Sequence, residues 1–548
     1  MRLPATFSAL VVFAVAAAPA LADDGVGQIK VGVPNAVTPV TGTAQPSAID
    51  PQFAARVVAV GSDPLENPSG VITKFGLLAT GVPTEPDQNL YLRFPQNPGG
   101  PTPGFNYGRN FLYQGHENAG NLAYVTRINL DVTDPAHRIT LLTPVNPQGL
   151  TNFNAIDGST YNPFTGTLLF TQETSTAGNG TGAVIQITTS WPPVVTTLGP
   201  FLGLGGFEGI HPNDKGVLYL QEDIGGATAP AGTLATIDGQ PNTPLRGARQ
   251  PNSFVYRYVP NNPKRLEDGG KLQVLQAIVD GSPVVFHQND LIGDLTSPAQ
   301  RKLHTPGTSW PIKWITVHES HAGDTTPFVA TTAAKAAGGT PFKRPENMAW
   351  LPGSNFRTFF FDPTGDTDAP TGQVPQLAAR GAWGAIFRVD LRDGDDRDGD
   401  DHDGRDDRDH DKSKPTDDGK ISIFVLGDQQ HNSFDNLAFA NERQLLAAED
   451  RGDSLHDQLQ TLDSVWAYDV KTGHVVRFVA LGRDAVAAVS GAEDNEPTGV
   501  FVSNGSPRKD DLLGTEDSLD GARGFFTQQH GQNTVFEFKK IDEHHARN

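Results

Sequence analysis

The sequence predicts an all-β protein, and a β-propeller of about six blades with loop insertions fits it best. Short segments alternate apolar and polar residues with a period of two and are rich in β-branched and aromatic types, which is typical of half-buried strands. The chain of 548 residues also holds 59 glycines and 42 prolines, which favour turns over long helices. Clear examples of strand, turn and strand are residues 122–144, 182–200 and 464–482.

Many strands of about four to seven residues argue for an architecture larger than one sandwich. Single strands of the same pattern recur at 216–223, 253–260, 384–391 and 533–540. A propeller accommodates them because its blades are strand meanders joined by loops of varied length. We therefore expect one propeller domain over residues 61–548, preceded by an extended segment at 23–60 that is rich in proline, threonine, alanine and glycine.

One segment breaks the strand pattern. Residues 393–418 are half aspartate, yet no stretch matches the D-x-D-x-D-G pattern of a calcium loop with its later glutamate. A run of like charges stays solvated rather than packing into a core. We expect a disordered, aspartate-rich insertion between two strands.

The N-terminus predicts a secretory signal peptide over residues 1–22. One arginine precedes an apolar stretch that ends in Ala20-Leu21-Ala22, an A-x-A cleavage pattern. A membrane anchor is the alternative, but the stretch is short, and no later segment reaches the ~18 apolar residues that a spanning helix needs. We expect cleavage after Ala22 and a secreted or periplasmic protein without a membrane span.

Charge and cysteine content exclude several partners and chemistries. The chain has 42 lysines and arginines against 63 aspartates and glutamates, a net charge of −21. Such a surface repels nucleic acid and anionic membranes, so we expect neither as a partner. No cysteine is present, which excludes disulfides, thiolate metal ligands and a cysteine nucleophile. We expect a monomer that binds a small anionic ligand.

Acidic side chains recur at the predicted strand ends, next to glycine or proline. Taken singly, each has an ordinary alternative as a turn former or a solvated charge. In a propeller, however, the strand ends converge on one axial face, and carboxylates brought together there repel one another unless a cation lies among them. Oxygen donors suit Ca²⁺, Mn²⁺ or Fe³⁺ rather than zinc. The acidic motifs include GHEN (115–118), TQET (171–174), GFEG (206–209), RPEN (344–347) and FDN (434–436).

The RPEN motif holds an arginine and a carboxylate close together. Pro345 separates Arg344 from Glu346 just ahead of an apolar run. One interpretation is a surface ion pair. The other is an anion site beside a metal, in which the guanidinium binds a phosphate or carboxylate through paired hydrogen bonds.

The order of the motifs resembles a known family. GHEN, GTLLFTQET, GFEG, FKRPENMAW, FDNLAF, AAEDRGD, EPTG and FFTQQHGQN follow one another as in PhoX-type alkaline phosphatases and related secreted bacterial proteins of unknown function. The resemblance spans about residues 105–540. It implies a six-bladed propeller holding iron and calcium ions, which bind phosphate and assist attack on a phosphomonoester.

The resemblance also implies roles for individual residues. The arginine of the R-P-E motif binds phosphate in that family, which makes Arg344 the expected catalytic residue here. The expected metal ligands are the carboxylates that match the family's N-H-E, C-E-E, H-E, R-P-E and P-D-N motifs, namely Glu117, Glu173, Glu208, Glu346 and Asp435.

The chain departs from the family pattern at the C-E-E motif. Thr171 stands where the family has a cysteine that ligates iron, and Gln172 stands where it has a glutamate. A hydroxyl and an amide are poor replacements for a thiolate and a carboxylate on Fe³⁺. The residues therefore support calcium, or a mononuclear site, better than a di-iron centre. The chain also lacks the twin arginine that often directs export in the family.

We expect a secreted, metal-dependent phosphatase that hydrolyses phosphomonoesters. The first alternative is a non-catalytic secreted propeller that keeps calcium and binds a ligand or partner, which Thr171 and Gln172 favour. The second is another propeller hydrolase, such as a calcium-dependent lactonase or a phytase-like enzyme. The orientation of Arg344 discriminates between a phosphate site and an ordinary ion pair.

Overall fold

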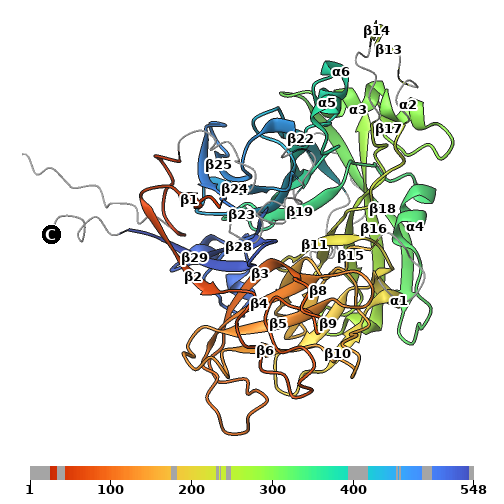
Figure 1. The fold of residues 1–548 in the computed structure, drawn as a ribbon. Coiled ribbons are helices and arrows are strands. Elements are labelled where there is room, and N and C mark those ends of the chain that lie inside the picture. The colour runs from red at the N-terminus through yellow and green to blue at the C-terminus, as the bar shows by residue number, and fades with distance from the viewer. Residues whose placement is uncertain are drawn as a thin grey trace, which may run out of the picture.

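The computed structural model confirms the all-β prediction (Figure 1). It describes residues 25–33, 44–174, 182–229, 234, 236–241, 248–392, 418–451, 455, 458–483 and 496–541. The predicted signal peptide lies outside the described residues, as does all of the predicted aspartate-rich insertion except Asp418. No helix within the described ranges is long and apolar enough to cross a membrane.

Two four-stranded antiparallel sheets come first along the chain. The first contains β3 (Glu85–Arg93), β4 (Asn110–Glu117), β5 (Tyr124–Asn129) and β6 (Ile139–Leu141). The second contains β7 (Ser159–Asn162), β8 (Thr167–Phe170), β9 (Ile185–Thr188) and β10 (Val195–Thr197). Each is a meander in which neighbours in sequence are neighbours in the sheet.

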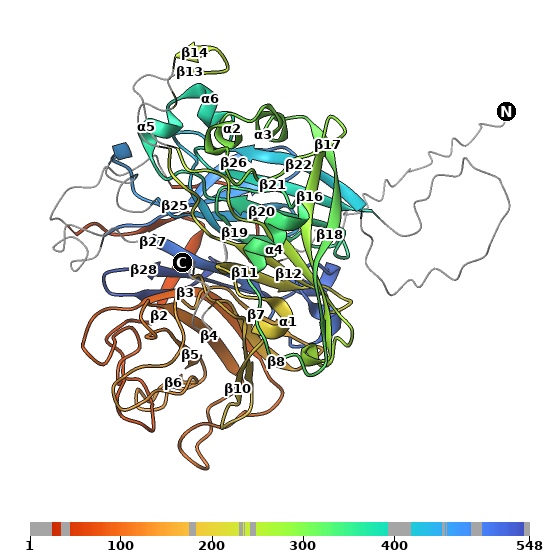
Figure 2. The ribbon, with the colours of Figure 1, turned by 90° about the vertical axis from the view of Figure 1, so that its right-hand side faces the viewer.

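A ten-stranded sheet follows, and it joins two meanders edge to edge. One meander runs through β11 (Phe207–Pro212), β12 (Leu218–Glu222), β15 (Val255–Pro260), β16 (Gly269–Val279) and β18 (Ser309–His321), with β17 (Ser282–Pro283) beside β16. The other runs through β19 (Pro345–Trp350), β20 (Thr358–Pro363), β21 (Ala385–Leu391) and β22 (Asp418–Leu426). Residues 309–313 of β18 pair with residues 418–422 of β22. Figure 2 shows the long β16–β18 ribbon along one side of the molecule.

The last two sheets are completed by the N-terminal strands. One contains β23 (Phe434–Phe439), β24 (Gln444–Glu449), β25 (Ser464–Asp469) and β26 (Val475–Ala480), with β1 (Ala48–Ile49) on its edge. The other contains β27 (Glu496–Ser503), β28 (Arg523–Gln529) and β29 (Thr534–Lys540), with β2 (Phe53–Ala59) as its outer strand. Part of the predicted extended segment thus belongs to the fold, because β1 and β2 pair with β26 and β29 near the C-terminal end of the described residues.

The helices are short and lie in the connections. They are α1 (Gly199–Leu202), α2 (Leu291–Leu295), α3 (Pro298–Leu303), α4 (Ala330–Ala337), α5 (Ala369–Gly372) and α6 (Pro375–Ala378), with 3₁₀ turns η1 (Leu266–Asp268), η2 (Lys509–Asp511) and η3 (Glu516–Leu519). A two-residue hairpin, β13 (Thr236–Ile237) and β14 (Gln240–Pro241), lies outside the main sheets.

The first strands of the meanders form a closed ring. β3 contacts β7, β7 contacts β11, and the contacts continue through β19, β23 and β27 back to β3. Figure 1 shows β3, β11, β19 and β23 near the middle of the molecule and β6, β10 and β18 at its periphery. This is the propeller-like arrangement that the sequence predicts, while the number of blades stays a prediction.

Apolar side chains between adjacent sheets hold the ring together. Phe360 on β20, for example, packs edge to face against Phe424 of β22 and Phe439 of β23, with ring centroids 5.1 and 5.9 Å away. Fully burying one such side chain contributes about 2–3 kcal/mol. The strand alternation is the cause, because every second residue of each strand faces a neighbouring sheet.

The closure through β2 depends on Phe53. Its ring is buried and lies 5.1 Å from that of Phe478 and 6.4 Å from that of Phe538. We expect Phe53→Ala to lower the free energy of unfolding by about 3–5 kcal/mol, because it leaves a cavity between two sheets. Urea unfolding measures the change. Val57→Ala is the control, since Val57 lies on the same strand but is 54% exposed, and an equal loss in both variants would contradict this role for Phe53.

Candidate metal centre

A short motif recurs at the start of the inner strands. In each copy an apolar residue or proline precedes an acid or threonine, and a glycine, asparagine or glutamine follows it. The motif lies at the beginning of β3, β11, β19, β23 and β27, and just ahead of β7. Its central residues are Asp87, Asp157, Glu208, Glu346, Asp435 and Thr498.

A β-bulge accompanies the motif in five of these described strands. The pairing register shifts between Pro86 and Asn89 on β3 and at the equivalent point of β11, β19 and β23, and on β27 it shifts one residue later, between Thr498 and Phe501. A bulge adds one residue to a strand and turns its side chain out of the regular alternation. The central acid of each motif is therefore directed toward the ring axis instead of a sheet face.

The second strand of a meander is antiparallel to the first, so it ends where the first begins. Glu117 ends β4, Glu173 follows β8, Asp223 follows β12, Asp450 follows β24 and Gln529 ends β28. Together with acids of the first-strand motifs they surround a cavity that is open to solvent. Its lining consists of Glu85, Asp87, Glu117, Asp157, Glu173, Glu208, Asp223, Arg344, Glu346, Asp435, Asp450, Glu496, Gln529 and His530.

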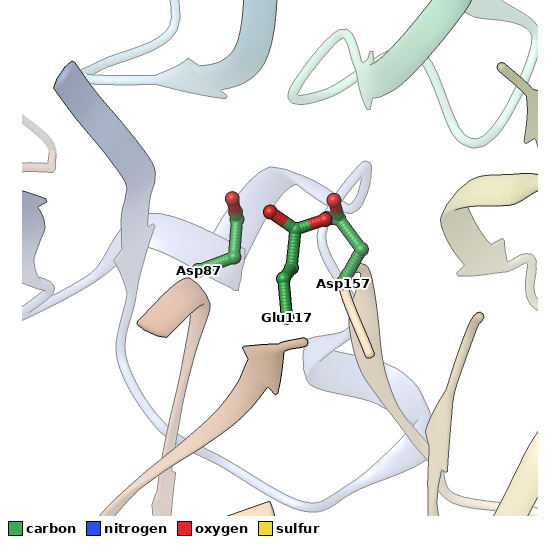
Figure 3. A group of neighbouring side chains, drawn as sticks. All are labelled: Asp87, Glu117 and Asp157. Atoms are coloured by element: carbon green, nitrogen blue, oxygen red, sulfur yellow. The ribbon is translucent and has the colours of Figure 1, made fainter. Parts of the chain in front are cut away.

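Three groups of carboxylates in this cavity have the spacing of cation sites. In each group one oxygen per residue lies within 4.8 Å of the others. Figure 3 shows the carboxyl groups of the first group directed toward the same space. Because Asp157 and Glu208 each belong to two groups, the three groups form a continuous row. They are Asp87, Glu117 and Asp157; Asp157, Glu173 and Glu208; and Glu208, Glu346 and Asp435.

Burial and mutual repulsion act on these carboxylates in the same direction. Burial raises the pKa of Glu208 well above its ordinary value, and the charges of Asp157 and Glu346 raise it further. The pKa values of Asp87, Glu117, Glu173, Glu346 and Asp435 are raised well above normal and that of Asp157 is also raised, with burial as the first cause in every case. Carboxylates packed this closely need either protons or cations between them.

Neutral donors fix the carboxylates at the two ends of the row. Thr498 Oγ1 donates a hydrogen bond of 2.7 Å to Asp87, and Gln529 Nε2 donates to Asp87 and Glu117 at 3.3 and 3.1 Å. Thr364 donates to Glu346, and Asn436 Nδ2 donates to Asp435 at 3.0 Å. In the middle of the row, Asp157 Oδ1 is buried and has no hydrogen-bond partner among the described residues. Such supporting donors orient metal ligands in proteins.

Arg344 lies inside the cavity and not in a surface ion pair. Its Nε donates to Asp223 Oδ2 at 2.8 Å, and its Nη2 lies 3.4 Å from Glu346 and 3.9 Å from Asp450. Burial by itself lowers the pKa of Arg344, but the carboxylates of Asp223, Glu346 and Asp450 outweigh it and raise the pKa. The backbone φ of Arg344 is +57°, an uncommon conformation for a residue with a side chain.

The two residues that depart from the family pattern face the backbone instead of the cavity. Thr171 Oγ1 donates to the carbonyl oxygens of Gly158 and Glu208. Gln172 accepts from the Asn154 N–H at 3.0 Å and donates to the Ala183 carbonyl at 2.6 Å. Both side chains support the backbone of cavity-lining segments, and neither lines the cavity.

The structure brings every predicted site residue to this one cavity. Arg344, Glu117, Glu173, Glu208, Glu346 and Asp435 all line it. Asp87 and Asp157 were not predicted from the sequence as metal ligands, yet they complete two of the three groups. The signal for Asp87 is present in the sequence, because Glu85-Pro86-Asp87-Gln88 repeats the pattern of EPTG at 496–499.

The fold and the cavity define an all-β, propeller-like protein with an acidic, cation-binding type of site. A family model described as alkaline phosphatase PhoX matches residues 245–506. The structure is similar to Pseudomonas fluorescens PhoX in complex with vanadate, a transition-state analogue, with a TM-score of 0.50, 13% sequence identity and coverage of 93% of this chain and 98% of that chain. The predicted resemblance to the PhoX family is confirmed.

Two further solved structures are similar to this chain only at low scores. A Trichoderma reesei protein of carbohydrate-active enzyme family AA12 gives a TM-score of 0.26 at 9% identity, covering 92% of this chain and 100% of that one. A puromycin hydrolase gives 0.22 at 11% identity, covering 76% and 57%. These scores are too low to support a shared architecture. No curated protein matches the chain.

The raised pKa values predict how the cation-free protein responds to pH. Burial raises the pKa of Glu496 to about 8, and other cavity carboxylates are shifted in the same direction. A carboxyl group with a raised folded-state pKa stabilises the fold below its unfolded pKa, near 4.5, and loses that contribution as the pH rises through the folded value. In a chelator, the melting temperature should therefore fall between pH 5 and pH 8.

Calcium should restore the melting temperature at pH 8, because the cation then replaces the lost protons. Differential scanning calorimetry with chelator and with calcium measures both effects. Asp157→Asn, at the shared position between two groups, should reduce the calcium effect, whereas Asp390→Asn on β21, outside the cavity, should not. A melting temperature that rises from pH 5 to pH 8 in chelator would contradict this account of the cavity.

Proposed function

We propose that the protein is a metal-dependent phosphatase that hydrolyses phosphomonoesters in the cavity. The observation that carries the proposal is the position of Arg344, whose guanidinium lies in a cavity lined mainly by carboxylates and is 3.4 Å from Glu346. The PhoX family match and the similarity to a PhoX structure solved with a transition-state analogue support it. An isolated arginine among acids is the arrangement expected where an anion and cations bind side by side.

The residues present fit divalent cations. The candidate ligand atoms are all carboxylate oxygens, which Ca²⁺ prefers. Asp157 belongs to two of the three groups, and its Oδ1 has no hydrogen-bond partner among the described residues, so this oxygen can bind a cation. We assign the cations to the three groups, with Glu117, Glu173, Glu208, Glu346 and Asp435 as ligands together with Asp87 and Asp157. Bound there, the cations would polarise the phosphoryl oxygens and neutralise developing negative charge.

The side chains around Arg344 prepare it to bind phosphate. Asp223 receives the Nε hydrogen bond and so fixes the plane of the guanidinium. Because Arg344 Nη2 lies beyond hydrogen-bond distance from Asp450, and at the limit from Glu346, a phosphate oxygen can compete for it. The cavity is open to solvent, which allows substrate, water and product to exchange.

Of the two kinds of ion that the PhoX resemblance implies, calcium is better supported than iron. An iron centre of the family type would need donors at Thr171 and Gln172, and both side chains are occupied by backbone groups. Calcium needs only the carboxylates. We therefore propose calcium as the resident cation. We further propose that the protein is exported after cleavage behind Ala22, acts as a monomer and takes a small phosphorylated substrate.

A non-catalytic calcium-binding propeller is the second candidate. The orientation of Thr171 and Gln172 favours it, because the positions of the family's cysteine and glutamate serve the backbone here. In that case the cavity would keep its cations and bind a ligand without turning it over. A binding protein and an enzyme differ in one readily measured property, which is turnover of a phosphomonoester.

Hydrolysis of p-nitrophenyl phosphate by the mature chain, refolded with calcium or with iron, tests the proposal. We expect turnover that requires metal and that falls about 10²–10³-fold in Arg344→Ala, as removal of a preorganised donor to a developing charge does in other enzymes. Arg344→Lys should retain part of it, because lysine keeps the charge but not the paired donors.

Arg388→Ala is the matched control, since Arg388 lies on β21 and pairs with Asp390 away from the cavity. It should retain full activity. Calcium binding without turnover under any metal would refute the enzyme and support the binding protein. Equal activity in Arg344→Ala and Arg388→Ala would remove Arg344 from the site.

A further inference from the structure

The cavity carries more negative charge than its cation sites can use. Among the described residues, eleven carboxylates, one arginine and one histidine line it, and the three groups use seven of the carboxylates. Three divalent cations would neutralise six charges and leave one of the seven uncompensated. The remaining four carboxylates are Glu85, Asp223, Asp450 and Glu496, and the other ionisable groups in the lining are Arg344 and His530. The cation-loaded cavity therefore stays negative.

Two of the extra carboxylates flank Arg344. Asp223 Oδ2 accepts from Arg344 Nε at 2.8 Å, and Asp450 Oδ2 lies 3.9 Å from Nη2. Asp450 is a quarter exposed at the cavity, and its backbone N–H is fixed by the Ser433 carbonyl at 2.7 Å. A phosphate bound to Arg344 would thus have a carboxylate on either side within a few ångströms.

An unused acceptor marks the same place. Asp223 is 5% exposed, and its Oδ1 has no hydrogen-bond partner among the described residues although its Oδ2 is paired. A buried carboxylate oxygen without a donor is costly unless a ligand supplies one. Since Asp223 belongs to none of the three cation groups, a donor group on the substrate can form a hydrogen bond to its Oδ1.

We propose that the substrate is the phosphomonoester of a short amino alcohol. This inference rests on the proposed function and names the substrate class of the same site. The phosphate binds Arg344 and the cation sites, and the ammonium group lies against Asp450 and Asp223. The same carboxylates repel leaving groups that carry further negative charge, which disfavours nucleoside diphosphates and triphosphates and polyphosphorylated esters.

Three non-hydrolysable phosphonates of similar size test the inference by calorimetric binding to the calcium-loaded protein. 2-Aminoethylphosphonate should bind about tenfold more tightly than propylphosphonate, as one unit-charge attraction at the edge of a cavity gives. Phosphonoacetate, which adds a negative charge, should bind more weakly than propylphosphonate. Higher salt should reduce these differences, because the rim is partly exposed.

Asp450→Asn should reduce the preference for 2-aminoethylphosphonate to about two- to threefold. Glu85→Gln, which changes another carboxylate of the cavity lining, serves as a second variant. Glu319→Gln on β18 is the control, since Glu319 is exposed and pairs with Lys271 far along the ribbon. Equal affinity for all three phosphonates, a preference for phosphonoacetate, or no binding of any of them would overturn the inference.

Turnover of p-nitrophenyl phosphate separates this inference from the proposed function. Turnover without a preference for the ammonium compound would refute the amino-alcohol substrate and leave the phosphatase standing. The predicted preference without turnover would support the ligand class and refute the enzyme.

Discussion

The repulsion between buried carboxylates is the constraint on which the rest of the structure depends. Seven of them lie in one row at the centre of the ring, and burial raises the pKa of each. Burying these charged groups costs free energy unless cations or protons compensate them, so they cannot themselves drive the folding of the ring. The ring of sheets must be stable enough to hold these carboxylates close together in spite of their mutual repulsion. The energy for this comes from the apolar layers between sheets and from the closure of the ring by β1 and β2.

The strand geometry explains how six separate segments deliver their side chains to one point. A regular strand alternates its side chains between the two faces of its sheet, so neither set of side chains points toward the ring axis. The bulge at the start of β3, β11, β19 and β23 solves this, because it contains the central acid of the motif and turns that side chain toward the axis. The arrangement is repeated around the ring, and only β27 replaces the acid by Thr498, which supports Asp87 through a hydrogen bond.

The sequence was sufficient for the all-β class and for much of the cavity, since alternation and strand-end acids are both local patterns. It predicted Glu208, Glu346 and Asp435 because the segments around them resemble the H-E, R-P-E and P-D-N motifs of the PhoX family. It did not yield Asp157, because Ile156-Asp157-Gly158 lies ahead of a four-residue strand in a segment with little alternation. The pairing of β2 with β29 was also out of reach, since nearly 500 residues separate partners such as Phe53 and Lys540.

The replacements at positions 171 and 172 show what residue types alone cannot decide. Their identities argued against an iron centre, but only the structure shows that both side chains bind backbone groups. Thr171 supports Gly158 and Glu208, and Gln172 supports Asn154 and Ala183. The three groups of cavity carboxylates then offer a cation oxygen donors alone. The chemistry of the cavity then depends on whether cations or protons separate the carboxylates, and Arg344 is a phosphate ligand only in the first case.

The most direct measurement is an anomalous diffraction map of crystals grown with manganese, an oxygen-seeking cation that scatters strongly enough to locate. The account predicts peaks along the row, with Asp157 and Glu208 each contacting two of them and Arg344 beside the last. A cavity without a peak, in which the carboxyl groups hydrogen-bond directly to one another, would contradict it and show that protons hold the centre together.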